Sequence, residues 1–423
     1  MTLKLENDSG LKSGSIVRKF IDEFSFIKGN FLIMVVSWLI LDFFTELPNT
    51  YYTLYVEALG ASTTTIGLLF SVGNIASALV QIPGGYLADK YGRRWLITSM
   101  TFVAAMSRLF FVYAPTWHWI MVGVIVSGLA GIYQPAMGAL IADSLPKEKR
   151  GIGFSIINLI ASVSTTPAPL FAGFLFASYG LLPSMRLTYK LVILGFLGAA
   201  FLRTRLSETV KNPAKINLSE MIREYPTSLR ESIGVWGLVP RSAFSLFIVN
   251  VIMNFTSGLF TPVLAFYIIR DLLIGEISYS YLMAALPISM IILALPAGRV
   301  IDHFGKKRPL LISFVLWFMA ILLMVDGDFN RILLAMIMVG LLMVMANSSL
   351  SALMADLVQT DHRGKVNGSM GFFSLLAGSI GVLIGGWLYD SVSHQLPFLL
   401  QLVFVLPAFL LTFFRVNEAE VNI

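Results

Sequence analysis

Two stretches of the sequence are copies of each other. Residues 83–94 read PGGYLADKYGRR, and residues 296–307 read PAGRVIDHFGKK. Both keep Pro, Gly, Asp and Gly at matching places, followed by two basic residues, and each residue of the first copy precedes its partner by 213 positions. The same offset relates further pairs, namely Asp143 with Asp356, Arg150 with Arg363 and Gln134 with Asn347. Such agreement at one ungapped offset indicates an internal duplication of most of the chain.

The composition is that of a membrane protein. Of the 423 residues, 57% are hydrophobic and 13% are charged, whereas soluble domains carry roughly 25% charged residues. There is no cysteine and there are four histidines, which argues against disulfides, Cys-bound metals and a His-based metal centre. The sequence also lacks a G-x-x-x-x-G-K-[ST] phosphate loop. We therefore expect that the protein binds no cofactor and is not an enzyme.

Twelve runs of the sequence are long and apolar enough to cross a bilayer as helices, which takes about 20 residues each. Nothing resembles the short alternating segments of a membrane β-barrel. The fold class that we expect is an all-α membrane protein, with spans near residues 31–56, 64–87, 95–114, 119–142, 152–177, 187–204, 242–268, 279–299, 309–325, 332–355, 366–388 and 396–414.

The basic residues predict how the spans are oriented. On the side of the N-terminus, the terminal segments and alternate loops hold 25 of the 30 Lys and Arg residues, and the opposite loops hold 3. The remaining two, Arg108 and Lys190, lie inside predicted spans. By the positive-inside rule, both termini are expected in the cytoplasm and the chain in the cytoplasmic (plasma) membrane. This sorting also explains the net charge of +6 without any nucleic-acid partner.

The duplication divides the spans into two sets of six. We predict an N-terminal bundle with its leading segment at residues 1–204, a cytoplasmic linker at 205–241 and a C-terminal bundle at 242–423. Two parallel bundles of this kind can rock about a central cavity and expose a solute site to one side at a time. The sequence thus predicts a transporter, and we expect it to act as a monomer in contact with membrane lipid.

The two copied loops resemble the signature loop of the major facilitator superfamily and its second copy. With twelve spans and a long middle loop, the resemblance covers essentially the whole chain. It implies two pseudo-symmetric six-helix bundles, secondary transport of a small molecule, and a cavity lined by spans 1, 4, 7 and 10. The motif is specific for the superfamily but not for a substrate.

The resemblance also implies a latch between the bundles at the cytoplasmic side. The counterpart of Asp89 in the family faces the start of span 11, which begins here near Arg363, and by the repeat Asp302 would face the start of span 5 near Arg150. Arg93 can pair with Asp143, and Lys306 with Asp356. Gly85 is expected to allow close helix packing and Gly92 a tight turn. The remaining members of the predicted latch are Arg94, Gly298 and Gly305. The alternative is that these charges only anchor loops at the membrane surface.

Two acids lie inside the first span. Asp42 and Glu46 are four residues apart and so share one helix face. A carboxylate at this depth is costly unless it is protonated, paired or hydrated. Aligning Pro48 with Pro262 places Thr256 and Phe260 at the matching positions of span 7, so the acids are not duplicated. We therefore interpret them as a substrate or proton site.

Arg108 in span 3 is the predicted partner of one of these acids, and it either neutralises that acid or only fixes helix packing. Other polar residues in spans are candidates for solute contact or for hydrogen bonds between helices. These are Asn49, Tyr133, Gln134, Asn158, Asn250, Asn254 and Asn347.

The leading functional hypothesis is a proton-coupled transporter of a small organic solute. Two acids without a matching excess of bases favour export of amphipathic or cationic compounds. An uptake symporter for a sugar or organic acid and a lipid flippase are alternatives, and a non-transporting membrane sensor is a remote one. Span 4 lacks the Arg that proton-coupled drug exporters usually carry, and span 5 keeps only part of their glycine pattern.

Overall fold

The structure is a computed structural model that describes residues 26–146, 149–211, 223, 226–227, 230, 233–359 and 362–418, with the side chains of Ile82, Asp89, Arg150, Phe154, Ser155, Asn158 and Asp302 excepted. The described residues form helices and no strand. The helices are α2 (Gly29–Asn49), α3 (Tyr52–Ala58), α4 (Thr63–Tyr91), α5 (Arg93–Ser107), α6 (Leu109–Val112), α7 (Trp117–Ala130), η1 (Gly131–Tyr133), α8 (Gln134–Ser144), α9 (Arg150–Thr165), α10 (Ala168–Tyr179), α11 (Leu181–Arg203), η3 (Val235–Gly237), α13 (Arg241–Phe260), α14 (Leu264–Phe266), η4 (Tyr267–Asp271), α15 (Glu276–Phe304), α16 (Lys307–Met324), α17 (Phe329–Leu357), α18 (Arg363–Ser391) and α19 (Leu396–Arg415).

Twelve stretches of the described chain are long and apolar enough to cross a membrane as helices. The prediction of an all-α protein with twelve spans is therefore confirmed. Large apolar side chains such as Leu295, Phe174 and Phe201 are 63–76% exposed along these helices. A surface of this kind is suited to hydrocarbon rather than to water.

Some predicted span ends are wrong because proline interrupts the helices. The first span was expected to run to residue 56, but α2 ends at Asn49 and α3 begins at Tyr52, next to Pro48. The seventh was expected to reach residue 268, but α13 ends at Phe260 and Pro262 follows. Proline lacks the N–H that the helix needs and obstructs the preceding turn. The two breaks occupy matching places in the two repeats.

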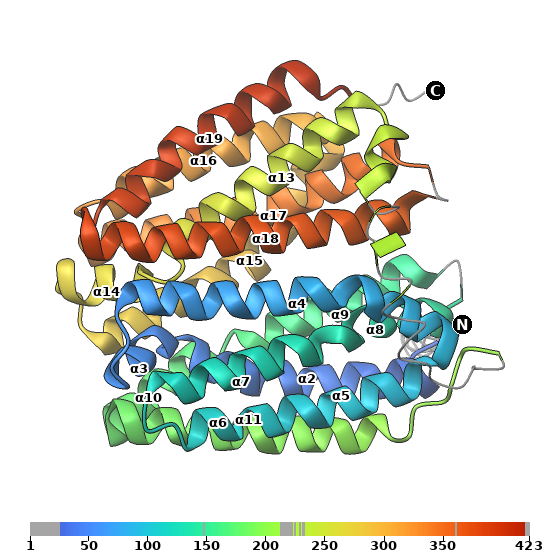
Figure 1. The fold of residues 1–423 in the computed structure, drawn as a ribbon. Coiled ribbons are helices and arrows are strands. Elements are labelled where there is room, and N and C mark those ends of the chain that lie inside the picture. The colour runs from blue at the N-terminus through green and yellow to red at the C-terminus, as the bar shows by residue number, and fades with distance from the viewer. Residues whose placement is uncertain are drawn as a thin grey trace, which may run out of the picture.

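The helices form two groups (Figure 1). The first group, α2 to α11, is drawn in blue and green, and the second group, α13 to α19, in yellow to red. The groups meet where α4 packs on α18 and α10 packs on α15. The start of α2 and the end of α19 lie at one end of the molecule, which we call the termini end, and α3, α10 and α14 lie at the other, which we call the distal end.

The two groups are bonded to each other at the distal end. Arg270 forms an ion pair with Glu57, and the backbone N–H and hydroxyl of Thr64 both donate to Asp390 at 2.7 Å. The Tyr51 hydroxyl donates to the Glu276 carbonyl at 2.7 Å. The hydrogen bonds that Arg270 donates to Glu57 are the main reason why the pKa of Arg270 lies above its ordinary value. The structure is thus a conformation whose distal end is closed.

Candidate functional site

Asp42 borders a cavity that is lined by the first group except for Leu375 of α18 in the second group. This Asp42 cavity has a volume of about 510 Å³, and its wall includes Trp38, Arg108, Tyr133 and Gln134. Three of the predicted site residues, Arg108, Tyr133 and Gln134, are therefore brought together with Asp42. A cavity of this volume has room for water, and contact with water would let a carboxylate within the membrane gain or lose a proton.

Glu46 lies one turn further along α2, and it is not part of the wall of the Asp42 cavity. Its Oε2 accepts a hydrogen bond of 3.0 Å from Asn49 Nδ2. Asn49 itself lines a second cavity of about 310 Å³, the Asn49 cavity, together with Tyr52, Asn74 and Arg108. The Asn49 and Asp42 cavities adjoin because four residues line both, namely Thr45, Ser77, Arg108 and Ser127.

The expected pairing of Arg108 with an acid is wrong. Its guanidinium lies 5.1 Å from the ring centre of Phe111 and 5.7 Å from that of Phe196. Its Nε–H has no hydrogen-bond partner among the described residues. The positive charge that interacts with Asp42 comes from another helix, so Arg108 faces the two cavities over aromatic rings instead.

That charge is Arg203, which the sequence analysis counted among the loop cations. Arg203 ends α11 and is 0% exposed. Its Nη1 donates to Thr101 Oγ1 at 2.7 Å and its Nε to Ser37 Oγ at 3.2 Å. Its guanidinium lies 5.6 Å from the ring centre of Tyr133 and interacts electrostatically with Asp42. Arg203 thus joins α2, α5 and α11 beside the Asp42 cavity.

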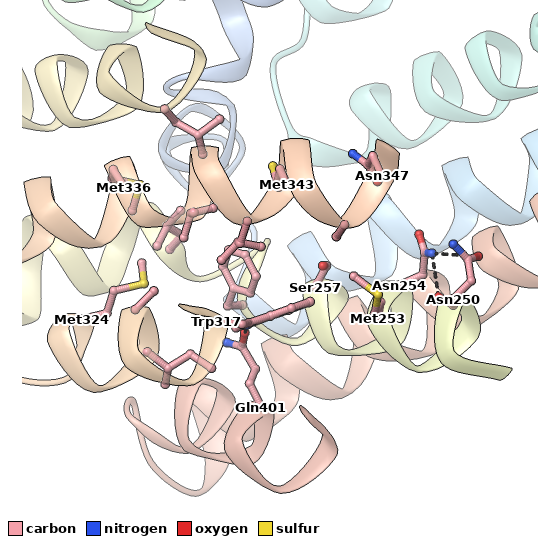
Figure 2. A pocket seen from close by; sticks show the side chains of 18 of the residues that line it. Asn250, Met253, Asn254, Ser257, Trp317, Met324, Met336, Met343, Asn347 and Gln401 are labelled. Atoms are coloured by element: carbon pink, nitrogen blue, oxygen red, sulfur yellow. Dashed lines mark hydrogen bonds between the residues drawn. The ribbon is translucent and has the colours of Figure 1, made fainter. Parts of the chain in front are cut away.

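The amide residues of the second group line a cavity of a different character. Asn250, Asn254 and Asn347 border a space of about 290 Å³ whose wall also holds five methionines, Met253, Met283, Met324, Met336 and Met343. Figure 2 shows the amides at one end of this methionine pocket and Met324 and Met336 at the other. Asn254 Nδ2 donates to the Asn250 carbonyl at 2.8 Å, so part of the amide set bonds within α13.

A fourth cavity lies between the two groups, because residues of both line it. It has a volume of about 340 Å³ and is called the bridging cavity. It shares Asn49, Tyr52 and Phe70 with the Asn49 cavity, and Phe260 and Leu264 with the methionine pocket. The four cavities therefore adjoin one another from Asp42 in the first group to the methionines in the second.

The copied loops have the same local structure. Gly92 and Gly305 adopt φ values of 96° and 79°, which favour glycine. Arg93 forms an ion pair with Asp143, and Lys306 forms the equivalent pair with Asp356. Each ion pair lies within its own group of helices, the first pair in the first group and the second pair in the second, and neither joins the two groups.

Two glycines of the predicted latch are not packing residues. A methyl group on Gly85 would lie 3.9 Å from Pro135, an ordinary contact, and one on Gly298 would meet nothing within 4 Å. The close approach is at Gly84, where the methyl would lie 2.3 Å from the Ile132 carbonyl oxygen. The assignment to Gly85 is wrong by one residue, because the two adjacent glycines face different neighbours.

Other latch residues lie outside what the structure describes or have local roles. The side chains of Asp89, Asp302, Arg150 and Asn158 are not described. Arg363 donates to the carbonyls of Val358 and Ala355 at the end of α17. Arg94 donates to the Thr204 carbonyl at 2.7 Å.

A carboxylate that was not predicted from the sequence lies at the start of α5. Glu208 accepts the backbone N–H groups of Arg93 and Arg94, both at 3.0 Å. Burial alone would raise the pKa of Glu208, but these bonds and those from Val210 and Thr209 outweigh it and lower the pKa. Glu418 accepts from the Lys307 N–H at the start of α16 in the same way. The duplicated third helices are thus both capped by an acid that follows a sixth span.

Replacing Glu208 with Ala is expected to lower the free energy of unfolding by about 1 kcal/mol at neutral pH, as for other helix caps. Because the pKa of Glu208 is lower in the folded state, its stabilising effect is present above the unfolded pKa of about 4.3 and is lost as the pH falls through the folded value. Thermal unfolding over a pH series measures this. A difference between wild type and variant that persists unchanged at strongly acidic pH would contradict the assignment.

In the described part of the chain, no group of three or more His, Cys, Asp or Glu residues could hold a metal ion. The arrangement offers a titratable acid beside a buried arginine, in cavities that adjoin between two groups of helices. These features suit the binding and movement of a small molecule.

Comparisons with known proteins agree with this geometry. The family model described as Major Facilitator Superfamily matches residues 30–245 and 246–422. An uncharacterized MFS-type transporter of Methanocaldococcus jannaschii, MJ1560, is 24% identical over 86% of this chain and 92% of its own length. The multidrug resistance protein MdtG of Klebsiella pneumoniae is 26% identical over 84% of each chain.

Solved structures show the same fold. The human organic anion transporter MFSD10 has a TM-score of 0.66 at 17% identity, covering 92% of this chain and 99% of its own. The peptide transporter POT in complex with sulfate has a TM-score of 0.70 at 16% identity, covering 91% of this chain and 93% of its own. From its family match, its relatives and its twelve spans, the chain belongs to the major facilitator superfamily: it is a multi-pass membrane transporter and not an enzyme.

Proposed function

We propose that this transporter exports amphipathic compounds in exchange for protons, by alternating access of one binding region to the two sides of the cytoplasmic membrane. Asp42 would carry the proton, with Glu46, Asn49 and the cavity-lining amides contributing to the site. The observation that carries the proposal is the position of Asp42 on a cavity wall, beside the buried Arg203. Similarity to multidrug resistance proteins supports the direction of transport.

A proton and the guanidinium of Arg203 would compete for the carboxylate of Asp42, and this competition would couple transport to proton exchange. An acid on a hydrated wall can be protonated from the side to which the cavity opens. Its loss of charge weakens the attraction to Arg203, which lies on another helix of the first group. A bound compound and a bound proton then favour different arrangements of the helices, which is the requirement for coupling.

The charges give no reason to restrict the substrate to cations. The sequence pattern favours cations only because Asp42 and Glu46 are set against the single base Arg108. The structure adds Arg203 to the same region, so Asp42 and Glu46 are matched by Arg108 and Arg203. The proposal is therefore limited to amphipathic compounds.

The proposal includes an orientation and a division of the chain. The termini end, with its basic residues, would face the cytoplasm. Residues 1–204 and 242–423 would form the two moving bodies, joined by a linker at 205–241. The closed distal end would then be the external side, and the protein would act as a monomer within the lipid. The two ion pairs of the copied loops would hold the loops in shape on the cytoplasmic side.

Replacing Asp42 with Asn is expected to weaken export driven by a pH gradient. Coupling free energies of about 1–3 kcal/mol predict a loss of about 5–150-fold in gradient-driven accumulation, while movement of a compound down its own gradient remains. Proteoliposomes with and without a pH gradient measure both. Glu46→Gln is the matched variant, because its carboxylate bonds with Asn49 and lies outside the Asp42 cavity wall. Gradient-driven export that survives both substitutions would refute proton coupling at these acids.

A second candidate function is uptake of an organic acid together with protons. The unpartnered Nε–H of Arg108 in the wall of two cavities favours it, because a guanidinium binds carboxylates well. Arg108→Gln separates the two candidates. If it abolishes transport of organic acids while amphipathic compounds are not transported at all, uptake replaces export as the function.

A further inference from the structure

The methionine pocket is the repeat counterpart of the charged cavities. With the offset of 213 residues, Ile321 of the pocket matches Arg108, Met324 matches Phe111 and Asn347 matches Gln134. Arg108, Phe111 and Gln134 line the Asn49 and Asp42 cavities. The same place in the duplicated fold is therefore hollow in both groups. One copy contains an arginine and the other an isoleucine.

The wall of the methionine pocket suits an uncharged, apolar guest. None of the described residues that line it carries a charge. Methionine side chains are flexible and polarizable, so they adapt to guests of different shape and make favourable contacts with aromatic rings. Met253, Met336 and Met343 enter from α13 and α17, two of the helices that the family resemblance places around the central cavity.

The polar groups in the depth of the pocket satisfy each other. Trp317 Nε1 donates to Gln401 Oε1 at 3.1 Å, and Gln401 Nε2 donates to the Pro397 carbonyl at 3.4 Å. Trp317 is 8% exposed and Gln401 is 2% exposed. A guest here needs no hydrogen bonds from these groups, so an apolar group enters without leaving a buried polar atom unpaired. In Figure 2 the indole of Trp317 lies between the amide end and the methionine end of the pocket.

We propose that the methionine pocket is a subsite for the uncharged aromatic or aliphatic part of a transported compound, whose polar part occupies the charged cavities of the first group. The inference rests on the proposed export of amphipathic compounds. The occupant is a transported molecule rather than a lipid tail because the pocket adjoins the bridging cavity through Phe260 and Leu264, and the bridging cavity adjoins the Asn49 cavity. One molecule can thus contact both groups of helices.

The chain has no cysteine, so a single introduced cysteine gives one site for alkylation. Met343→Cys and Met253→Cys report on the methionine pocket, and Thr45→Cys reports on the Asp42 and Asn49 cavities. The probe is N-phenyl-1-naphthylamine, an uncharged aromatic amine. We expect it to slow alkylation of both pocket cysteines at least about tenfold, corresponding to 1.4 kcal/mol, and to leave Thr45→Cys unchanged. Energy transfer from Trp317 to the bound probe, reduced in Trp317→Phe, is the second measurement.

Three results would overturn the subsite. They are the absence of protection at both pocket cysteines, equal protection at Thr45→Cys, and protection of delipidated protein by phospholipid alone, which would identify a lipid site. A link to transport requires that the probe competes with an exported compound, and that Met343→Gln relieves this competition. If wild-type protein shows no gradient-driven export but keeps the protection pattern, the proposed function fails and the apolar site stands. If export occurs without protection, the subsite fails alone.

Discussion

Replacing Arg203 with Met is expected to lower the free energy of unfolding by about 3–5 kcal/mol, because two hydrogen bonds donated by a buried charged group are lost and each is worth about 1.5–3 kcal/mol. Arg203 is fully buried and bonds to Ser37 and Thr101 on two other helices. Methionine fills much of the volume but supplies neither the charge nor the hydrogen bonds. Thermal unfolding of purified protein measures the loss.

The exposed neighbour Arg205 provides the matched control. Arg205→Met is two residues away and removes the same charge from the surface, so stability is expected to change by no more than about 0.5 kcal/mol. Arg203→Lys keeps the charge but loses the planar guanidinium that bonds Ser37 and Thr101 together. Its stability should therefore lie between those of Arg203→Met and Arg205→Met. Equal stability of Arg203→Met and Arg205→Met would show that Arg203 is not a structural centre of the first group.

The second large effect is expected from Gly67→Val, which should open the distal end. A methyl group on Gly67 would lie 2.4 Å from the Val382 carbonyl oxygen, and this contact joins α4 of the first group to α18 of the second. Overpacking costs about 1–3 kcal/mol, which shifts the equilibrium away from the closed distal end about 5–150-fold. A cysteine at Thr53 in the bridging cavity should then react faster with a membrane-impermeant maleimide.

Two other glycines separate this effect from general instability. Gly385→Val creates an equally close contact, 1.9 Å from the Leu259 carbonyl oxygen, but within the second group. It should lower thermal stability without changing the reactivity of the cysteine. Gly198→Val meets nothing within 4 Å and should change neither property. If Gly385→Val speeds the reaction as much as Gly67→Val, the contact between α4 and α18 does not control the distal end.

The fold was predictable because its signals are long and repeated. Twelve apolar runs predict the spans, and the copied loops around Gly92 and Gly305 predict the family. The span ends were less predictable near Pro48 and Pro262. Proline there ended one helix and another began within a few residues, so the apolar run was longer than the helix.

The site was predictable only where composition alone reveals a residue. Asp42 stands out because an acid in an apolar run is costly. Arg203 did not, because the last residue of a span next to a basic loop can face water or the bundle, and the sequence alone does not distinguish the two. The partner of Arg108 was wrong for the same reason: two arginines compete for one region, and only packing decides which is paired.

The capping acids were missed because they break the repeat. Glu208 and Glu418 are separated by 210 residues rather than 213, so the ungapped offset that relates the copied loops does not align them. Their shared role is visible only in the N–H groups of Arg93 and Lys307 that they accept.

Distances between pairs of spin labels, measured by double electron–electron resonance at each end of the protein, test the central claim of alternating access. The cysteine-free chain allows one pair at the distal end, Tyr113→Cys with Leu273→Cys, and one at the termini end, Arg205→Cys with Arg415→Cys, all at exposed positions on opposite groups. When the pH is changed between acidic and alkaline values with an exported compound bound, the two distances should change in opposite directions. The distance at the distal end should lengthen as the distance at the termini end shortens. Distances that stay constant, or that change in the same direction at both ends, would contradict the account.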